Sequence, residues 1–325
     1  MNSKSTFIAN IGLDESINEI IVIISFFIIY FFLRKNASKS LVLFILKQDL
    51  ILSFYQKSNH KFFMKRIVFF VIFCFFLSCT KVPISGRRQL NLISELDLIQ
   101  MSSQQYLKFI NQSHVIRNTY EAKLIEKVGK NISEAVERYL LRNNQQKRVE
   151  GFDWEFKLID DDLVNAWCMP GGKICFYSGI LKYTQDENGL AVVMGHEIAH
   201  AIARHGNERM SKALAVQMGG VALSVAVMNQ GTEIQEIFQE AYGISSGLSG
   251  LAFSRRNEIE SDKLGLVFME LAGYDANYAS DFWERMSKSS QHSPAFLSTH
   301  PSDEKRIEEI NSFLVSDKFS KHIHR

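Results

Sequence analysis

The chain has 325 residues, of which 46% are hydrophobic and 22% charged, a composition typical of globular proteins. Its net charge is +2, but the basic excess lies at the front, because residues 79–325 carry 28 lysines and arginines against 31 aspartates and glutamates. A mildly acidic domain lacks the basic patch of nucleic-acid-binding proteins, so we expect no nucleic acid partner.

Two apolar runs mark the first 78 residues. The stretch MKRIVFFVIFCFFLSC, residues 64–79, has a basic start, a short apolar run and a small residue before Cys79, the layout of a bacterial lipoprotein signal. We therefore expect residues 64–78 to be removed and Cys79 to carry lipid, with residues 1–63 added by a misassigned start codon. A buried or interfacial helix is the alternative for this stretch. The run at 18–34 is short for a spanning helix, and an inner-membrane anchor there is a further alternative.

The remaining chain predicts an α+β fold that is mainly helical. Apolar residues at Leu124, Ile125, Val128 and Ile132 have helical spacing within a helical region that we expect from residue 95 to about 143. Alternation through Trp154, Phe156 and Leu158, followed by a Pro-Gly-Gly turn, predicts the only strand region. The expected parts are an anchor segment, 79–94, one domain, 95–315, and a polar tail, 316–325.

Four later segments have helical patterning. One is a helix with a capping box from Thr184 to Glu187 and an end at Gly206. The apolar stretch 213–228 is too short to span a bilayer and predicts a packed helix or active-site cover. A third helix runs from about Phe253 to Gly273, and a fourth follows Ser302 as its N-cap.

Two cysteines flank the Pro-Gly-Gly turn, and neither belongs to a CxxC zinc pattern. Cys168 and Cys175 face each other across the expected hairpin and form a disulfide, or they are two separate buried thiols. Both alternatives are open on the sequence.

The stretch GHEIAH carries the chemistry, because its two histidines are four residues apart and share one helix face. Two imidazoles on one face, His196 and His200, can bind one zinc ion, and Glu197 can act as the base for a water at the open position. A solvated helix face is the alternative, but the segment is largely apolar, and buried charges need partners.

A catalytic zinc site needs a third protein ligand. His205 does not supply it, because the pattern that uses a nearby histidine places glycine and histidine where this chain has Ala203 and Gly206. The remaining source is a later helix: Glu258 and Asp262 share a face, so that one binds metal while the other supports a ligand histidine. Spacing alone does not rank these two carboxylates.

The motifs GHEIAHAIARH, SRRNEIESD and LAGYD resemble the zinc metallopeptidases of the HtpX and CAAX prenyl protease family. PISGRRQLNLIS, NAWCMPGGKICFYSGIL and STHPSDEKRI make the chain similar, more narrowly, to its periplasmic lipoprotein branch, typified by BepA and LoiP, and to the mitochondrial protease Oma. The resemblance extends over nearly all of the chain after Cys79. It implies a zincin-like, gluzincin-type domain with a small β-sheet edge over the zinc helix.

This resemblance implies that Glu258 joins His196 and His200 as a zinc ligand and that Asp262 supports a ligand from behind. It gives His300 a catalytic position near the metal, where it stabilises the oxyanion or, in a closed state, occupies the open zinc position; a purely structural histidine is the alternative. An extended substrate would bind along the edge strand at Asn165, Ala166, Pro170, Gly171 and Gly172.

We therefore expect a metalloendopeptidase with one Zn²⁺ per chain, acting on unfolded or misfolded envelope proteins. The lipid on Cys79 would hold it to the membrane of a bacterial envelope, and Thr80 in place of aspartate favours the outer membrane, facing the periplasm. A chaperone-like periplasmic binding protein that cleaves little, or an inner-membrane protease anchored by 18–34, is the alternative function.

Overall fold

The structure is a computed structural model that describes residues 79–217, 233–242, 253–288, 296–297, 300 and 304–324. The chain divides into two compact units, and nearly all described residues belong to the unit made of Thr80–Leu214 and Gly231–Arg325. Both N-terminal apolar runs, most of the stretch 213–228, and Ser302 lie outside the described residues. Within the described ranges, no helix has the length and apolar character that crossing a membrane requires.

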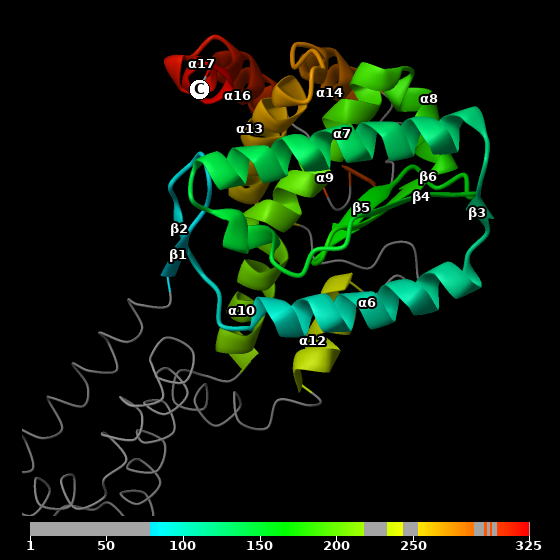
Figure 1. The fold of residues 1–325 in the computed structure, drawn as a ribbon, viewed down its shortest axis with the longest axis vertical. Helices are drawn as coiled ribbons and strands as arrows, with labels where there is room; N and C mark the ends of the chain where they lie inside the picture. The colour runs from blue at the N-terminus through cyan, green and yellow to red at the C-terminus, as the bar shows by residue number, and fades with distance from the viewer. Residues whose placement is uncertain are drawn as a thin grey trace, which may run out of the picture. The chain divides into compact units, whose positions relative to one another are not determined.

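The expected α+β, mainly helical fold is confirmed (Figure 1). The strands are β1 Cys79–Lys81, β2 Arg88–Leu90, β3 Val115–Ile116, β4 Glu155–Ile159, β5 Ala166–Met169 and β6 Lys173–Tyr177. The helices are α6 Glu95–Gln112, α7 Tyr120–Arg142, α8 Leu181–Thr184, α9 Glu187–Ala203, α10 His205–Gln217, α12 Glu233–Tyr242, α13 Arg255–Leu271, α14 Tyr278–Lys288, α16 Glu304–Leu314 and α17 Asp317–Ile323, with 3₁₀ turns η1 Gln146–Val149 and η2 Ser178–Ile180.

The main sheet has four strands in the order β3-β4-β6-β5. β4 and β6 are parallel, whereas β3–β4 and β5–β6 are antiparallel, so β5 forms one edge. The turn between β5 and β6 contains Gly171 and Gly172 at φ of 90° and 81°, a conformation that side chains other than glycine rarely adopt. The expected strand region is therefore confirmed.

Three features differ from the sequence expectation. The helical region at 95–143 is two helices separated by β3, and the anchor segment contains a β1–β2 hairpin, so the described residues hold strands outside the expected region. The disulfide alternative is wrong: both cysteines are free and buried. Cys168 lies opposite Ile174, and Cys175 lies opposite Trp167, so the two thiols project from opposite faces of the sheet.

Helix α9 is the centre of the core. All its residues from Gly189 to Ala203 are buried, because α7, α13 and α14 pack around it. It starts two residues later than a capping box at Thr184 requires, since the Asp186 carboxylate accepts the Gly189 N–H at 2.9 Å. It also ends before Gly206, at Arg204, whose φ of 58° turns the chain directly into α10.

Two glycines allow α9 and α13 to approach closely. A Cβ atom on Gly195 would lie 2.9 Å from the Gly265 carbonyl oxygen, and one on Gly265 would lie 2.9 Å from the Gly195 carbonyl carbon. Real Cβ atoms do not make such contacts with backbone, so any side chain here would push the helices apart. Gly195 directly precedes His196, so this crossing sets the distance between the zinc helix and the carboxylates of α13.

The β1–β2 hairpin is tied to the domain by buried Arg148. Its guanidinium donates to the Ile202 carbonyl, near the end of α9, at 2.8 Å and also to the Lys81 carbonyl. The Ser211 hydroxyl of α10 accepts the Leu92 N–H at 2.9 Å. The segment expected to follow a lipid anchor is therefore part of the folded domain.

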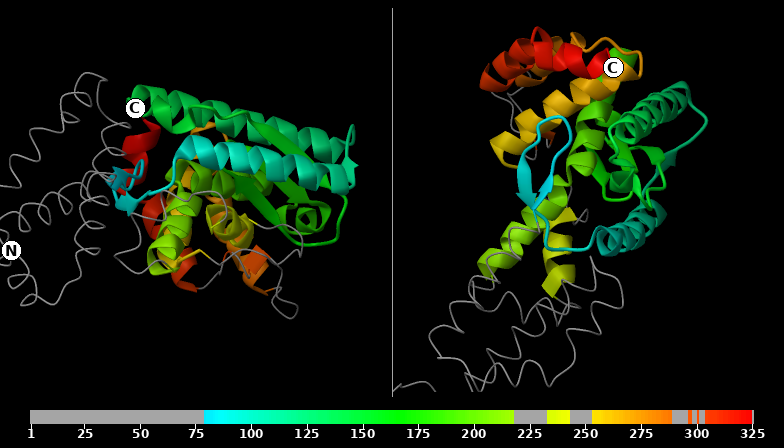
Figure 2. Two further views of the ribbon diagram at one scale, coloured as in Figure 1. Left: turned by 90° about the horizontal axis from the view of Figure 1, so that it is seen from below. Right: turned by 60° about the vertical axis from the view of Figure 1, so that its left-hand side comes forward.

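The C-terminal helices α14, α16 and α17 group together with α13 (Figures 1 and 2). Ile310 and Phe313 of α16 are buried, as is Phe319 of α17, whose ring contacts that of Phe313. The last residues, expected as a polar tail, thus include a helix that packs on the domain. His322 of the same helix contacts Tyr139 at 2.9 Å.

Candidate metal centre

Four buried side chains converge where α9 meets α13. Ligand atoms of His196, His200, Glu258 and His300 all lie within 4.8 Å of one another. The Nε2 atoms of His196 and His200 are 3.0 Å apart, and they lie 3.4 and 3.3 Å from the two oxygens of Glu258. The His-Glu-x-x-His spacing therefore does what helical periodicity predicts: both imidazoles face the same point.

These donors fit a zinc ion. Two ligands about 2.0–2.2 Å from a tetrahedral zinc lie roughly 3.3–3.6 Å apart, close to the separations observed here. Two neutral imidazole nitrogens and one carboxylate oxygen are the donor set of a catalytic zinc site. Among the described residues, the Glu197 Oε1 atom is also buried without a hydrogen-bond partner, so a polar group facing the cluster still has bonding capacity.

Glu197 lies between the cluster and the edge strand. Its carboxylate accepts the backbone N–H of Cys168, and its Oε1 lies 3.4 Å from His300 Nε2. Burial raises the pKa of Glu197 to about 7, although the nearby His300 opposes the shift. A carboxyl group in such surroundings can exchange a proton near neutral pH.

Glu258 sits in the first turn of α13, where the helix dipole favours an anion. Burial opposes its ionisation, but the charges of His300 and Arg306 hold the pKa of this carboxyl well below its usual value. The residue is fully buried, so the cluster holds an ionised carboxylate away from solvent, as a metal ligand would require. The two carboxylates that spacing could not rank thus occupy different places.

Asp262 lies behind His196 rather than in the cluster. Its Oδ1 is 2.9 Å from His196 Nδ1, so His196 can donate from that nitrogen while Nε2 faces the cluster. Arg306 of α16 clamps the same carboxylate from Nε at 2.5 Å and Nη2 at 2.9 Å. The arginine also reaches Glu258 Oε2 at 3.1 Å, which joins the ligand and the supporting carboxylate through one cation.

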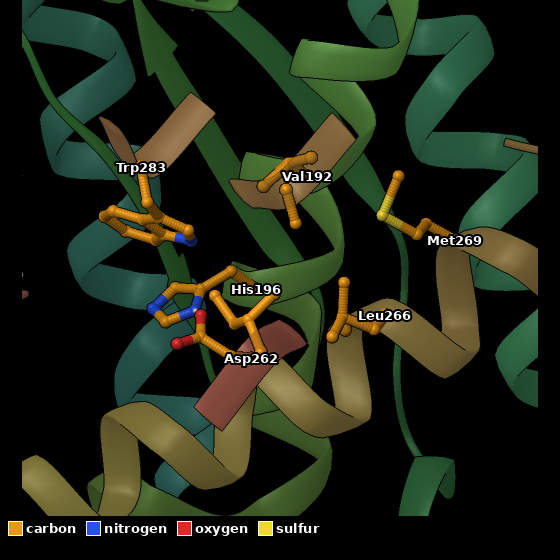
Figure 3. Close-up of a pocket in the computed structure, with 9 residues that line it drawn as sticks. Val192, His196, Asp262, Leu266, Met269 and Trp283 are labelled. Atoms are coloured by element: carbon orange, nitrogen blue, oxygen red, sulfur yellow. Dashed lines mark hydrogen bonds and ion pairs between the residues drawn. The ribbon is translucent and has the colours of Figure 1, made fainter. Parts of the chain in front are cut away.

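A small cavity lies beside His196, lined by residues of α9, α13, α14 and α16. Figure 3 shows the His196 ring next to Asp262, with the Trp283 indole on the same side. Trp283 is fully buried, stacks under the Arg306 guanidinium at 3.6 Å and makes an edge contact with the His196 ring. Aromatic and aliphatic side chains therefore form most of the wall behind this histidine.

His300 belongs to the cluster through Nδ1, which lies 3.1 Å from His196 Nε2 and 3.2 Å from Glu258 Oε2. Its backbone N–H donates to the Phe296 carbonyl at 2.8 Å, and the Phe296 N–H donates to the Val164 carbonyl at 2.9 Å. The histidine is therefore positioned from the loop that leads into β5.

The strand β5 presents its free edge beside Glu197. Asn165 O accepts the Tyr177 N–H, so the register turns the main-chain groups of Ala166 and Cys168 away from β6. Asn165 Oδ1 caps the Ala166 N–H at 2.9 Å. The turn residues Gly171 and Gly172 do not share this free edge. Their carbonyl oxygens accept the N–H groups of Asp153 and Glu155, respectively.

Known proteins are similar to this chain over the region that contains the cluster. The family model "Peptidase family M48" matches residues 126–314. The mitochondrial metalloendopeptidase OMA1 of Schizosaccharomyces pombe is 34% identical over 245 residues, covering 74% of this chain and 68% of that protein. The chain belongs to peptidase family M48.

Two further relatives match over less of their length. The human mitochondrial metalloendopeptidase OMA1 is 26% identical, and the match covers 82% of this chain and 52% of the human protein. The putative beta-barrel assembly-enhancing protease of Vibrio cholerae is 33% identical, and the match covers 47% of this chain and 33% of that protein. Across eight of the curated relatives that it matches, the chain spans between 31% and 68% of the relative's own length. The expectation of a metalloendopeptidase is confirmed at the level of the family.

Sequence reasoning missed the arginine of this M48 site and the glycines behind it. Arg306 is four residues before Ile310 and therefore shares its inward-facing side of the helix. A charged residue at such a position needs a buried partner, and this could have identified Arg306 from the sequence. Gly195 and Gly265 carried no signal alone, because their importance depends on two helices 70 residues apart in the chain.

Proposed function

We propose that this M48 protein is a zinc-dependent metalloendopeptidase that hydrolyses peptide bonds in unfolded or misfolded proteins of a bacterial envelope. The observation that carries the proposal is the buried Glu197 carboxylate beside the cluster of His196, His200 and Glu258, with one oxygen that accepts no hydrogen bond among the described residues. A purely structural zinc site fills its coordination with protein ligands and needs no such base.

In this proposal His196, His200 and Glu258 hold one zinc ion, which supplies Lewis-acid activation of water and of the scissile carbonyl. Glu197 takes a proton from the attacking water while the water oxygen bonds to the carbonyl carbon. Glu197 then returns that proton to the amide nitrogen as the C–N bond breaks. Asp262 and Arg306 keep His196 oriented throughout.

The substrate would bind as an extended strand. The outward carbonyl groups of Ala166 and Cys168 can accept N–H groups of a peptide, while the Ala166 N–H donates to Asn165 Oδ1. The Cys168 N–H donates to Glu197, which brings a peptide on this edge close to the base. Only a locally unfolded segment can add a strand in this way. The proposed substrate contacts are therefore Ala166 and Cys168, beside Asn165, and not the carbonyls of Gly171 and Gly172, which pair within the domain. Pro170 stays a predicted contact.

We also propose a cellular location for the protein. The lipoprotein signal before Cys79 and the likeness to beta-barrel assembly-enhancing proteases support an envelope protein of the lipoprotein branch, attached to the outer membrane by lipid. Mass spectrometry of the protein made from its own gene should find a lipidated N-terminus at Cys79. Peptides from residues 1–60 in the native protein would contradict this and favour an inner-membrane anchor.

The activity is tested with Glu197→Gln. The variant should bind one zinc per chain like the wild type but cleave reduced, carboxymethylated casein at least about 10³-fold more slowly, because the general base is lost. Zinc content is measured on the same sample as cleavage. Unchanged cleavage by a zinc-loaded variant would refute the mechanism, whereas casein binding without cleavage by the wild type would favour a chaperone-like function.

A further inference from the structure

His205, which the sequence excluded as a ligand, lies directly behind His200. It is the first residue of α10, and the left-handed turn at Arg204 brings its ring back against the end of α9. His205 Nδ1 is 3.1 Å from His200 Nδ1, and His205 Nε2 is 2.8 Å from Glu260 Oε2. The ring is 1% exposed, so both nitrogens have protein partners in a dry site.

These contacts are consistent with one arrangement of protons. His200 Nε2 faces the cluster, and a metal-binding nitrogen carries no proton, so the His200 proton lies on Nδ1. That N–H donates to His205 Nδ1, which leaves the His205 proton on Nε2. The Nε2–H in turn donates to Glu260. A carboxylate thus selects the tautomer of His200 through an intervening histidine.

Glu260 is itself held by the β1–β2 hairpin. Arg87 donates to Glu260 from Nε at 2.9 Å and from Nη2 at 2.6 Å, and the Ser85 hydroxyl donates to the same carboxylate. Arg87 also makes two hydrogen bonds to Glu208 at 2.9 and 2.7 Å. Lys212 and Arg256 lie 2.7 and 3.7 Å from Glu208, so three cations, including Arg87, face the two carboxylates.

One other group competes for His205. The Ser261 hydroxyl oxygen lies 3.2 Å from the same Nδ1 that faces His200. The hydroxyl can rotate to donate elsewhere, whereas within the described residues no other side-chain acceptor lies at comparable distance from His200 Nδ1. The histidine pair is therefore the defining contact, and Ser261→Ala should change zinc affinity little.

We propose that His205, Glu260 and Arg87 form a positioning relay that fixes the orientation and tautomer of His200, so that the N-terminal hairpin is part of the metal centre. The inference rests on the proposed zinc site. Groups that orient a ligand in this manner typically contribute about 10–100-fold in metal affinity.

The first test compares two carboxylates that share Arg87. Glu260→Gln and Glu208→Gln both weaken an ion pair with Arg87, but only Glu260 contacts His205. Zinc affinity of the full chain is measured by competition with a chromophoric chelator, with thermal unfolding of the zinc-free protein in parallel. Glu260→Gln should weaken zinc binding about 10-fold or more, whereas Glu208→Gln should lower Tm and leave affinity within about 3-fold.

The second test separates the two nitrogens of His205. The amide of asparagine occupies the place of Nδ1, and the amide of glutamine reaches the place of Nε2. His205→Asn keeps an acceptor for His200, so it should bind zinc more tightly than His205→Gln, with His205→Ala at least about 10-fold weaker than wild type. All three should still bind one zinc ion at saturation, because His205 is not a ligand.

The outcomes are distinguishable. Equal zinc affinities in wild type, Glu260→Gln and His205→Ala would overturn the relay, as would affinity losses that follow Tm equally in the Glu260 and Glu208 variants. If Glu258→Ala abolishes zinc binding in the same assay, the proposed zinc site stands whatever the relay variants do. A wild-type chain that binds no zinc would overturn both proposals.

Discussion

The two histidines of the HEIAH motif are supported differently, although they lie one helical turn apart. His196 contacts the Asp262 carboxylate directly, and Arg306 from the C-terminal part of the chain clamps that carboxylate. On its Nδ1 side, His200 reaches a carboxylate, that of Glu260, through His205, and Arg87 from the N-terminal hairpin clamps this carboxylate. Both carboxylates belong to α13, two residues apart, so one helix supports both sides of the site.

Segments far apart in the chain, at Arg87 and at Arg306, thus support the two histidines of the candidate metal centre separately. The His196 side, with Arg306, Asp262 and Glu258, is buried, so its charges are shielded from water. The His200 side ends at Arg87, whose side chain is 14% exposed. We expect changes on the His196 side to cost more stability, and four predictions test this difference from the largest effect to the smallest.

The largest effect should come from the helix crossing that both sides share. Gly265→Ala puts a Cβ atom 2.9 Å from the Gly195 backbone, so it should cost about 3 kcal/mol or more and abolish zinc binding. Urea unfolding and zinc content measure the two effects. Gly86→Ala, where no atom lies within 4 Å, is the control and should cost only about 1 kcal/mol through its positive φ. Similar losses in both variants would contradict a packing origin.

Breaking the His196 side comes next. Arg306→Ala leaves Glu258 and Asp262 buried without their cation, which should cost about 3–5 kcal/mol. Arg87→Ala on the other side should cost less, because Arg87 is partly exposed and Lys212 still neutralises Glu208. Unfolding free energies measured by urea denaturation test the order, and an equal or greater cost at Arg87 would reverse our comparison.

The charges on the His200 side should make the unfolding free energy depend on pH in the acid range. Burial raises the pKa of Glu208, but Arg87 and Lys212 outweigh it and lower this pKa to about 2. A lowered folded pKa stabilises the protein above the unfolded value near 4.5, and that stability is lost as pH falls from about 4.5 towards 2. Between pH 6 and pH 3, Glu208→Gln should lose on the order of 2 kcal/mol less unfolding free energy than wild type. Parallel pH profiles would contradict the assignment.

The smallest effect concerns His300, which can act in two ways. Its Nδ1 lies among the donors, which favours occupation of the open zinc position over oxyanion stabilisation. His300→Ala should then raise the cleavage rate of carboxymethylated casein about 3–10-fold, a change near 1 kcal/mol. A fall of about 10²–10³-fold in kcat with unchanged KM would instead show that His300 stabilises the oxyanion.

The local part of the site was predictable from the sequence. His196, Glu197 and His200 share one face because helical periodicity is a property of neighbouring residues, and the apolar segment around them predicts burial. The strand region was equally legible, since alternation and a Pro-Gly-Gly turn act over a few residues. The ends of helices were less predictable from the sequence. Asp186 caps α9 in place of the expected Thr184, because side chains near a helix start compete for the same N–H groups.

Only the tertiary structure decided the contacts between distant segments. Spacing left Glu258 and Asp262 equivalent, and the close approach of α9 and α13 put one among the donors and the other behind His196. Arg87 and Arg306 act on this same helix from segments 219 residues apart, and strand register separated the two cysteines. Local patterns record which face a residue occupies, whereas the partner across that face depends on how whole elements pack.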